Sequence, residues 1–200
     1  MEATRSAQRV IPLKGWLDEV LVILLVIVAL LLGWLVRSWV QGQTATFTSD
    51  DGAVSLRYPA GWLQQTDKDT LLTVSDVRAN GSFKPSFSLT TREMNPDYPL
   101  TASDVLVSLS VQRAEQLTAY RVLNVDEGTV DGLDASSLTY AYVSEPEGGL
   151  QASLPVVVEA VDWVVLRGGK AYVFSFAAPA EEFSSRAGAF SSIMSSVDFR

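Results

Sequence analysis

The sequence contains no cysteine and no histidine among its 200 residues, and these two absences exclude several kinds of chemistry. Without cysteine there is no disulfide, no thiolate nucleophile, no cysteine-bound metal and no lipidated cysteine anchor. Without histidine there is no Ser-His-Asp or Cys-His catalysis, no histidine proton transfer near neutral pH and no usual zinc site. We therefore expect a protein that is not an enzyme and that has no cofactor and no metal site.

Basic side chains are also scarce, and charge is distributed unevenly along the chain. Residues 1–40 carry 4 basic and 3 acidic side chains, whereas residues 41–200 carry 11 basic and 20 acidic side chains, a net charge of −9. A negative field of this kind repels nucleic acid and anionic lipid headgroups. We expect no nucleic-acid partner, while cationic or neutral partners are compatible with this charge.

One long hydrophobic run lies near the start of the chain. Residues 20–36 carry no charge and are apolar apart from Gly33. A membrane-spanning helix needs about 20 mainly apolar residues, with a lower limit of about 17, and aromatic residues mark its two interfaces. The pattern predicts one transmembrane signal-anchor helix over residues 16–40. Its predicted contacts with the lipid bilayer include Trp16, Val20, Leu24, Ile27, Leu31, Trp34 and Trp39.

Two other interpretations of this run stay open. A cleaved signal peptide has a hydrophobic core of about 7–15 residues followed by a small-x-small cleavage site. The run here is longer, and residues 37–45 contain no Ala-x-Ala. A buried core helix normally keeps one polar face, which this run lacks. Both comparisons favour an uncleaved anchor.

Basic residues near the ends of the run predict its orientation. Arg5, Arg9 and Lys14 precede it, and only Arg37 follows it closely. Because basic residues concentrate on the cytoplasmic side, we expect the N-terminus inside a plasma (inner) membrane and the rest outside. The predicted organisation is a cytoplasmic segment, a membrane span, a linker and an extracytoplasmic domain, at residues 1–15, 16–40, 41–46 and 47–200.

Alternating apolar and polar residues predict many strands in the outer domain. Thr101 and Asp104 resemble a capping box at the start of a helix over residues 101–118, and a second helix follows Pro179. Turn residues are found at 50–52, 126–128, 131–132 and 168–169. The predicted strands cover residues 46–48, 54–58, 71–77, 86–94, 120–125, 135–143, 156–166, 171–177 and 196–200. Short turns between successive strands favour an antiparallel sheet with helices packed on it, the α+β class.

Three stretches in this order resemble a known family. They are Tyr-Pro-Ala-Gly-Trp at residues 58–62, Val-Asp-Gly-Leu-Asp-Ala at 130–135, and Arg-Gly-Gly-Lys-Ala-Tyr-Val-Phe-Ser-Phe-Ala-Ala-Pro at 167–179. Together with the terminal Ser-Val-Asp-Phe they resemble the PsbP-like superfamily, over about residues 45–200. Its namesake is the extrinsic subunit of photosystem II, and it includes membrane-anchored bacterial relatives. The resemblance implies an α/β/α sandwich around an antiparallel sheet, no enzyme activity, and an accessory or assembly role on membrane complexes.

Aromatic residues on two predicted strands are candidates for an apolar ligand pocket, although aromatics on one face of a sheet more often form its core. These residues are Tyr140, Tyr142, Tyr172, Phe174 and Phe176. The acidic segment with Asp126, Glu127, Asp131 and Asp134 offers oxygen ligands for calcium, but it lacks EF-hand spacing and its Asp and Gly residues are ordinary in turns. Paired serines at residues 184–196 could act as nucleophiles only with a lysine as the base. Lys170 is the nearest lysine in sequence, but no motif links it to these serines, so they are more simply interpreted as serines on a helix surface.

Three functions are compatible with these patterns. The first is an accessory module that docks on a membrane protein complex or helps to assemble it. The second is a binding module for a small apolar ligand or a cation. The third is an enzyme that uses only carboxylates, as glycosidases do, and it would need two carboxylates about 5–10 Å apart in a cleft. The absent residues make the third function the least favoured.

Overall fold

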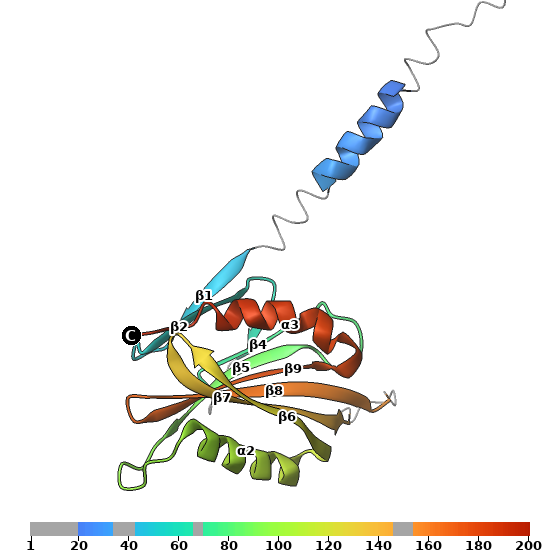
Figure 1. The fold of residues 1–200 in the computed structure, drawn as a ribbon. Coiled ribbons are helices and arrows are strands. Elements are labelled where there is room, and N and C mark those ends of the chain that lie inside the picture. Colours follow the sequence, from blue (N-terminus) through green and yellow to red (C-terminus); the bar gives the residue numbers. More distant parts are fainter. Residues whose placement is uncertain (1–19, 34–42, 66–69, 146–153) are drawn as a thin grey trace, which may run out of the picture. The chain divides into compact units, whose positions relative to one another are not determined.

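The computed structural model of the chain describes residues 20–33, 43–65, 70–145 and 154–200 (Figure 1). The chain divides into two compact units, Met1–Gln43 and Thr44–Arg200. The boundary lies three residues before the predicted start of the outer domain, because the first strand begins at Thr44.

In the first unit, residues 20–33 form a helix whose side chains are exposed, including Val20, Leu24, Ile27 and Leu31. Within the described ranges, no helix combines the length and the apolar character that a membrane crossing requires. The predicted span over residues 16–40 is thus not supported by the described part of the chain. Its two ends lie outside the described residues, and so do Trp16, Trp34 and Trp39.

The described residues of the second unit form two antiparallel sheets and two helices. The larger sheet has the strand order β3-β4-β5-β9-β8-β7-β6, and the smaller has the order β1-β2-β10. The strands are β1 (Thr44–Thr48), β2 (Val54–Pro59), β3 (Leu63–Gln65), β4 (Leu72–Ser75), β5 (Ser86–Glu93), β6 (Thr118–Val130), β7 (Leu133–Ser144), β8 (Val156–Arg167), β9 (Lys170–Pro179) and β10 (Asp198–Phe199). The helices are α2 (Ala102–Gln116) and α3 (Ala180–Met194). The predicted α+β class is confirmed.

The two helices lie on opposite faces of the larger sheet (Figure 1). On one face, α3 and the smaller sheet cover a core that contains Phe87, Phe174 and Phe176, all fully buried. On the other face, α2 covers a smaller core in which Val105 and Leu106 of the helix meet Leu138 of β7. Because side chains alternate along a strand, each long strand contributes to both cores.

Two strands differ from the expectation drawn from the sequence. β6 continues through Asp126-Glu127-Gly128, where a turn was predicted, and the chain turns only at Asp131-Gly132. The reason is that β6 lies at the end of the sheet, where charged side chains stay in water and do not interrupt a strand. The short strand β3 was not predicted, because its three residues are all exposed and have no apolar alternation.

Candidate functional site

The five aromatic residues predicted to line an apolar pocket are divided between the two faces of the sheet. Tyr140 is buried in the core beneath α2 and Tyr142 packs against the same core, whereas Tyr172, Phe174 and Phe176 are buried in the core beneath α3. The pairing explains the division, because Tyr140 is opposite Ala160 of β8, and Ala160 is opposite Ala177 of β9. Even positions of β7 therefore share a face with odd positions of β9, so the five side chains do not converge on one pocket.

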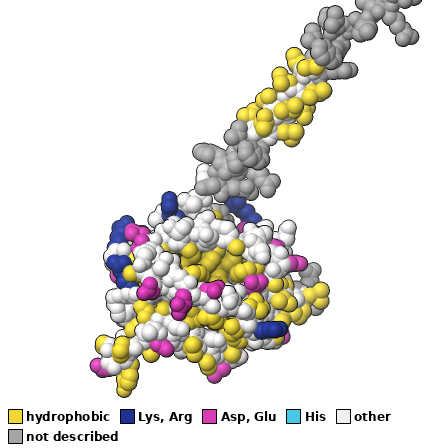
Figure 2. Space-filling view, viewed as in Figure 1, with side chains coloured by type: hydrophobic (Ala, Val, Ile, Leu, Met, Phe, Trp, Pro, Cys, Tyr) yellow, Lys and Arg dark blue, Asp and Glu magenta, His cyan; other side chains and the backbone are white. Residues whose placement is uncertain are grey.

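A different apolar groove opens between α3 and the end of the β6–β7 hairpin. It has a volume of about 430 Å³ and is partly open to solvent. A hollow floored by apolar side chains is visible on this face in Figure 2, with acidic side chains along its lower border. The residues that line the groove are Thr129, Val130, Asp131, Trp163, Phe190, Ser191, Met194, Ser195 and Val197.

The side of the groove formed by α3 is well packed, because its aromatic residue, Phe190, contacts two other rings of the core. The ring of Phe190 stacks on Phe176 with centroids 5.2 Å apart and an interplanar angle of 19°. It also contacts the ring of Phe87 at 6.3 Å. Met194 lies one helical turn further along, on the same apolar face. This wall of the groove is thus a continuation of the core that reaches the surface.

The floor of the groove contains Trp163, which extends from β8 across β7 toward β6. Gly128 of β6 makes room for its indole, since a Cβ atom built there would lie 3.0 Å from Cη2 and 3.1 Å from Cζ3 of the ring. The residue of β7 that pairs with Trp163 is the small Ser137, which in turn pairs with Asp126 of β6. Its small side chain lets the indole reach across β7. A large partly buried indole therefore lies beneath the end of the outermost strand.

Polar groups surround the mouth of the groove. Asp131 begins the β6–β7 turn with a positive φ of 50°, followed by Gly132 at 74°, the backbone that tight hairpin turns require. One oxygen of Asp131, Oδ2, accepts a hydrogen bond of 2.9 Å from the backbone N–H of Phe199, which ties β10 to this turn. Ser191 of α3 and Ser195, which directly follows the helix, are exposed at the opposite rim. The groove thus joins an apolar floor to a rim of hydroxyls and one carboxylate.

This combination is suited to binding an apolar group. Ligand sites are typically concave, about 300–1,000 Å³ in volume, mostly apolar and fitted with a few polar groups. The groove meets each of these conditions. From the sequence, Asp131 was interpreted as a turn residue or a calcium ligand, and Ser191 and Ser195 as surface serines. Their position at the edge of the apolar core is a feature that a sequence pattern does not contain.

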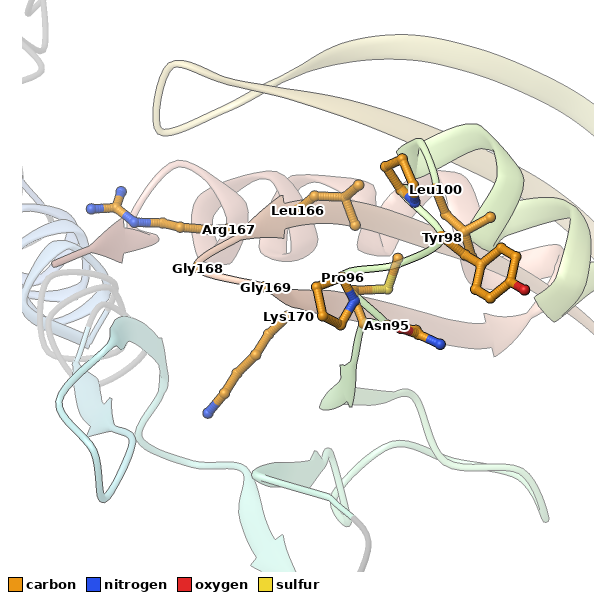
Figure 3. A pocket seen from close by; sticks show the side chains of 11 residues that line it. Asn95, Pro96, Tyr98, Leu100, Leu166, Arg167, Gly168, Gly169 and Lys170 are labelled. Carbon is orange, nitrogen blue, oxygen red and sulfur yellow. The ribbon is translucent and has the colours of Figure 1, made fainter.

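A second pocket lies at the β8–β9 turn and has a volume of about 310 Å³. Arg167 and Lys170 flank it, but Figure 3 shows both side chains pointing away from it. Lys170 instead forms an ion pair with Asp51, with Nζ 3.3 Å from Oδ2. Arg167 lies over the ring of Phe199, 5.7 Å from its centroid. No charge converges on this pocket, so it is a weaker candidate than the groove.

A buried polar network lies between α2 and the sheet. Asp162 of β8 has no exposed surface, and its carboxylate receives Arg113 of α2 at 3.3 Å and the hydroxyl of Tyr140 at 3.4 Å. Burial raises the pKa of Tyr140, and the neighbouring carboxylate raises it further, so its hydroxyl stays a hydrogen-bond donor. The guanidinium also donates to Ser175 of β9 at 3.5 Å. Because no substrate reaches a fully buried carboxylate, we assign this network to holding α2 on the sheet.

The remaining candidates from the sequence have ordinary surroundings. Asp126 and Glu127 are exposed on β6, while Asp131 and Asp134 flank the following turn. No group of three or more acidic residues in the described part of the chain is placed to hold a metal ion. Among the paired serines, Ser185 and Ser192 donate to carbonyl oxygens of their own helix, at Glu182 and Gly188.

Comparison with known proteins identifies the fold. No family model matches the chain, and no curated protein matches it in sequence. The solved structure of cyanobacterial PsbP (CyanoP) from Synechocystis sp. PCC 6803 is similar with a TM-score of 0.57 and 18% identity, covering 78% of this chain and 92% of that one. LpqN, involved in cell envelope biogenesis of Mycobacterium tuberculosis, has a TM-score of 0.52 and 14% identity, covering 78% and 89%.

A third structure with this fold is the Ran-binding protein Mog1p of Saccharomyces cerevisiae, with a TM-score of 0.51, 12% identity, and coverage of 78% of this chain and 95% of that one. The resemblance to PsbP-like proteins that the sequence motifs predicted is confirmed as a resemblance of fold. At these identities the likeness establishes the fold alone, because one fold hosts many functions.

Proposed function

We propose that the chain is a non-enzymatic interaction module that docks on, or helps to assemble, a membrane protein complex outside the plasma (inner) membrane. The observation that carries the proposal is the apolar groove between α3 and the β6–β7 hairpin. One of its walls is an aromatic side chain packed on the core, and its lining residues include no pair of groups suited to catalysis. A Ran-binding protein and a cell-envelope protein with the same fold are consistent with a binding role.

The hydrophobic run over residues 16–40 is the proposed membrane tether. Its uncharged core and the excess of basic residues before it support a single pass with the N-terminus in the cytoplasm. A tether raises the local concentration of the domain near other membrane proteins, so that a weak contact in one groove suffices. The acidic charge of residues 41–200 keeps the domain away from anionic headgroups and leaves the groove free for a protein partner.

The experiment compares two variants of the full chain that place the same side chain at two positions of α3. Ser191→Arg fills the rim of the groove, whereas Ser184→Arg lies on an exposed part of the helix outside it. Membranes from cells producing each protein are crosslinked and solubilised gently. We expect the wild type and S184R to give one adduct of constant mass, and S191R to lose it. An equal adduct in S191R, or only free monomer in the wild type, would contradict the proposal.

Protease protection of intact cells tests the proposed topology separately. We expect residues 44–200 to be cleaved from outside and to pellet with the membrane before cleavage. Protection of this domain inside the cell would contradict the extracytoplasmic part of the proposal.

A small apolar ligand is a second candidate occupant, favoured by the volume of the groove, about 430 Å³. It predicts that the fluorescent apolar probe N-phenyl-1-naphthylamine binds the full chain and raises its melting temperature, because a ligand that binds only the folded state stabilises it. S191R should abolish both effects and S184R should leave them unchanged. If the probe does not bind and S191R still loses the crosslinked adduct, the occupant of the groove is a protein partner and not a small apolar ligand.

A further inference from the structure

The last strand of the larger sheet has an unusually long free edge. β6 pairs with β7 along its inner side, and no other strand in the described residues pairs with its outer side. It spans 13 residues, whereas β3 at the opposite end of the sheet has three. Edge strands expose rows of N–H and C=O groups that can pair with another chain, and natural proteins usually shorten, bend or charge them.

Bending protects only one half of β6. The pairing with β7 shifts register between Thr118 and Arg121 and again between Val122 and Asn124. Ala119 adds a positive φ of 54° in this half. From Asn124 to Val130 the pairing is continuous. This second half is therefore straight enough to accept another strand, while the first half is bent away from one.

Exposed apolar side chains lie on both sides of the point where the regular half begins. Val122 and Leu123, just before it, are 44% and 49% exposed, and Val125, within it, is 57% exposed. Gly128 follows on the face toward α3, and the indole of Trp163 lies against it. A strand added here would bury the aliphatic side chains, and a side chain placed opposite Gly128 would lie over Trp163 next to the groove. The edge thus provides apolar contacts in addition to backbone hydrogen bonds.

The charges of the regular half favour a partner strand of opposite charge. Asp126 and Glu127 are exposed in its middle, and Asp131 and Asp134 follow in the turn. The one basic residue of β6, Arg121, lies in the irregular half. If two copies of the chain paired through their regular halves, these acidic residues would face each other and repel. A basic strand would instead place its charges opposite Asp126 and Glu127.

We propose that an extended segment of another protein pairs with Asn124–Val130 as an eighth strand, with Lys or Arg residues opposite Asp126 and Glu127 and apolar residues opposite Val125 and Gly128. The inference rests on the proposed function, since it specifies how the partner of the interaction module binds. Backbone pairing supplies the affinity, and the charged and apolar side chains supply the specificity.

The probe is the acetylated, amidated hexapeptide Thr-Val-Lys-Lys-Val-Thr, whose pattern fits β6 in either direction. Two control peptides replace both lysines by glutamate, or carry N-methyl groups on alternate backbone amides, which removes hydrogen-bond donors. Binding is measured by NMR on the ¹⁵N-labelled full chain in detergent micelles. We expect the lysine peptide to shift the amide resonances of Asn124–Val130 and to slow their hydrogen exchange. We expect neither control peptide to do so.

Charge-reversed variants test the same contact from the other side. D126K/E127K should weaken binding of the lysine peptide roughly tenfold, because two exposed ion pairs are replaced by repulsion. D50K/D97K changes the net charge by the same amount at exposed sites away from β6 and should leave binding unchanged. The proposal is wrong if the lysine peptide protects amides of another element. It is also wrong if the N-methylated peptide binds equally well, or if D126K/E127K binds the lysine peptide as tightly as the wild type. A dimer formed through β6 overturns it in favour of a second copy of the chain.

The two proposals fail in different ways. If the crosslinked adduct depends on Ser191 but the peptide leaves β6 untouched, strand addition is wrong and the interaction module stands. If the peptide protects Asn124–Val130 but membranes yield no adduct, strand addition stands and docking on a membrane complex is wrong.

Discussion

The guanidinium of Arg113 lies with Nε 3.3 Å from Oδ2 of Asp162, and this ion pair joins α2 to the middle of the larger sheet. The two partners differ in exposure, since the side chain of Arg113 is 30% exposed and that of Asp162 is 0% exposed. The carboxylate has therefore lost its water and depends on its protein partners. Removing one partner therefore changes the free energy of unfolding by more than the ion pair itself contributes, because the other partner stays buried without it.

Arg113→Met should lower the free energy of unfolding by about 3 kcal/mol, the lower end of the range for removing one partner of a buried pair. The reason is that the buried carboxyl group of Asp162 loses its cationic partner and keeps the hydrogen bond from the hydroxyl of Tyr140. The lower end applies because water reaches the Arg113 side of the pair. Urea unfolding of R113M and the wild type at pH 7 measures the difference.

The double variant R113M/D162L distinguishes the strength of the ion pair from the cost of burying a carboxylate without its partner. Replacing both partners by apolar side chains removes the buried carboxylate but leaves the buried hydroxyl of Tyr140 without its acceptor, so we expect the double variant to be more stable than R113M and about 1–2 kcal/mol less stable than the wild type. A double variant as unstable as R113M would show that the ion pair itself, rather than the stranded carboxylate, accounts for the loss.

Gly128→Ala should disturb the groove from beneath. The added Cβ meets the indole of Trp163 at 3.0 Å, so the ring must shift. We expect a loss of about 1 kcal/mol, as for overpacking in a filled core, with a changed tryptophan emission maximum. The matched control is Gly188→Ala on α3, where nothing lies within 4 Å of the new Cβ. This control should gain about 0.5–1 kcal/mol, because alanine is the better helix former.

Acid should weaken the β1–β2 hairpin through Asp51. The hydroxyl of Ser49, the backbone N–H of Ala53 and the ammonium of Lys170 hold the pKa of Asp51 at about 2, below its usual 3.8. A lowered pKa means that the stabilisation is complete above about pH 4 and disappears as the pH falls toward 2. Asp51→Asn removes it, so the gap in urea midpoint between D51N and the wild type should narrow over this range. A gap of constant size between pH 7 and pH 2 would contradict the assignment.

The start of α2 should be sensitive to Thr101. Its Oγ1 accepts from the N–H of Asp104 at 3.2 Å, and its own N–H donates to Asp104 at 2.8 Å. Thr101→Ala breaks this capping box and should cost about 1 kcal/mol. Ser108→Ala on the exposed side of α2 is the comparison, and it should change stability by less than about 0.5 kcal/mol. Thermal unfolding of both variants checks the ranking.

Much of the fold could be predicted because its local signals agree with its tertiary structure. The capping box at Thr101 begins α2, and Gly168-Gly169 turns β8 into β9. Alternation along β9 placed Phe174 and Phe176 on one face. β6 was predicted less well, because the exposed residues of an edge strand, such as Asp126 and Glu127, have the same composition as a turn.

The groove could not be predicted for a different reason. Trp163 and Phe190 show the same apolar spacing whether they lie inside the core or at its margin. The features that place them beside the groove are the small size of Gly128 and Ser137 on neighbouring strands and the place where α3 ends, and these depend on pairing that no local pattern specifies. The division of the five aromatic residues between two faces depends on the same pairing across β8.

The smaller sheet has a mechanical consequence. β1 and β10 both pair antiparallel with β2, so they run parallel to each other on its two sides. The beginning of β1, at Thr44, and the end of β10, near Arg200, therefore point in opposite directions along β2. Tension applied between the two ends of this domain would pull along the strands and load their backbone hydrogen bonds together, in shear, instead of opening them one after another.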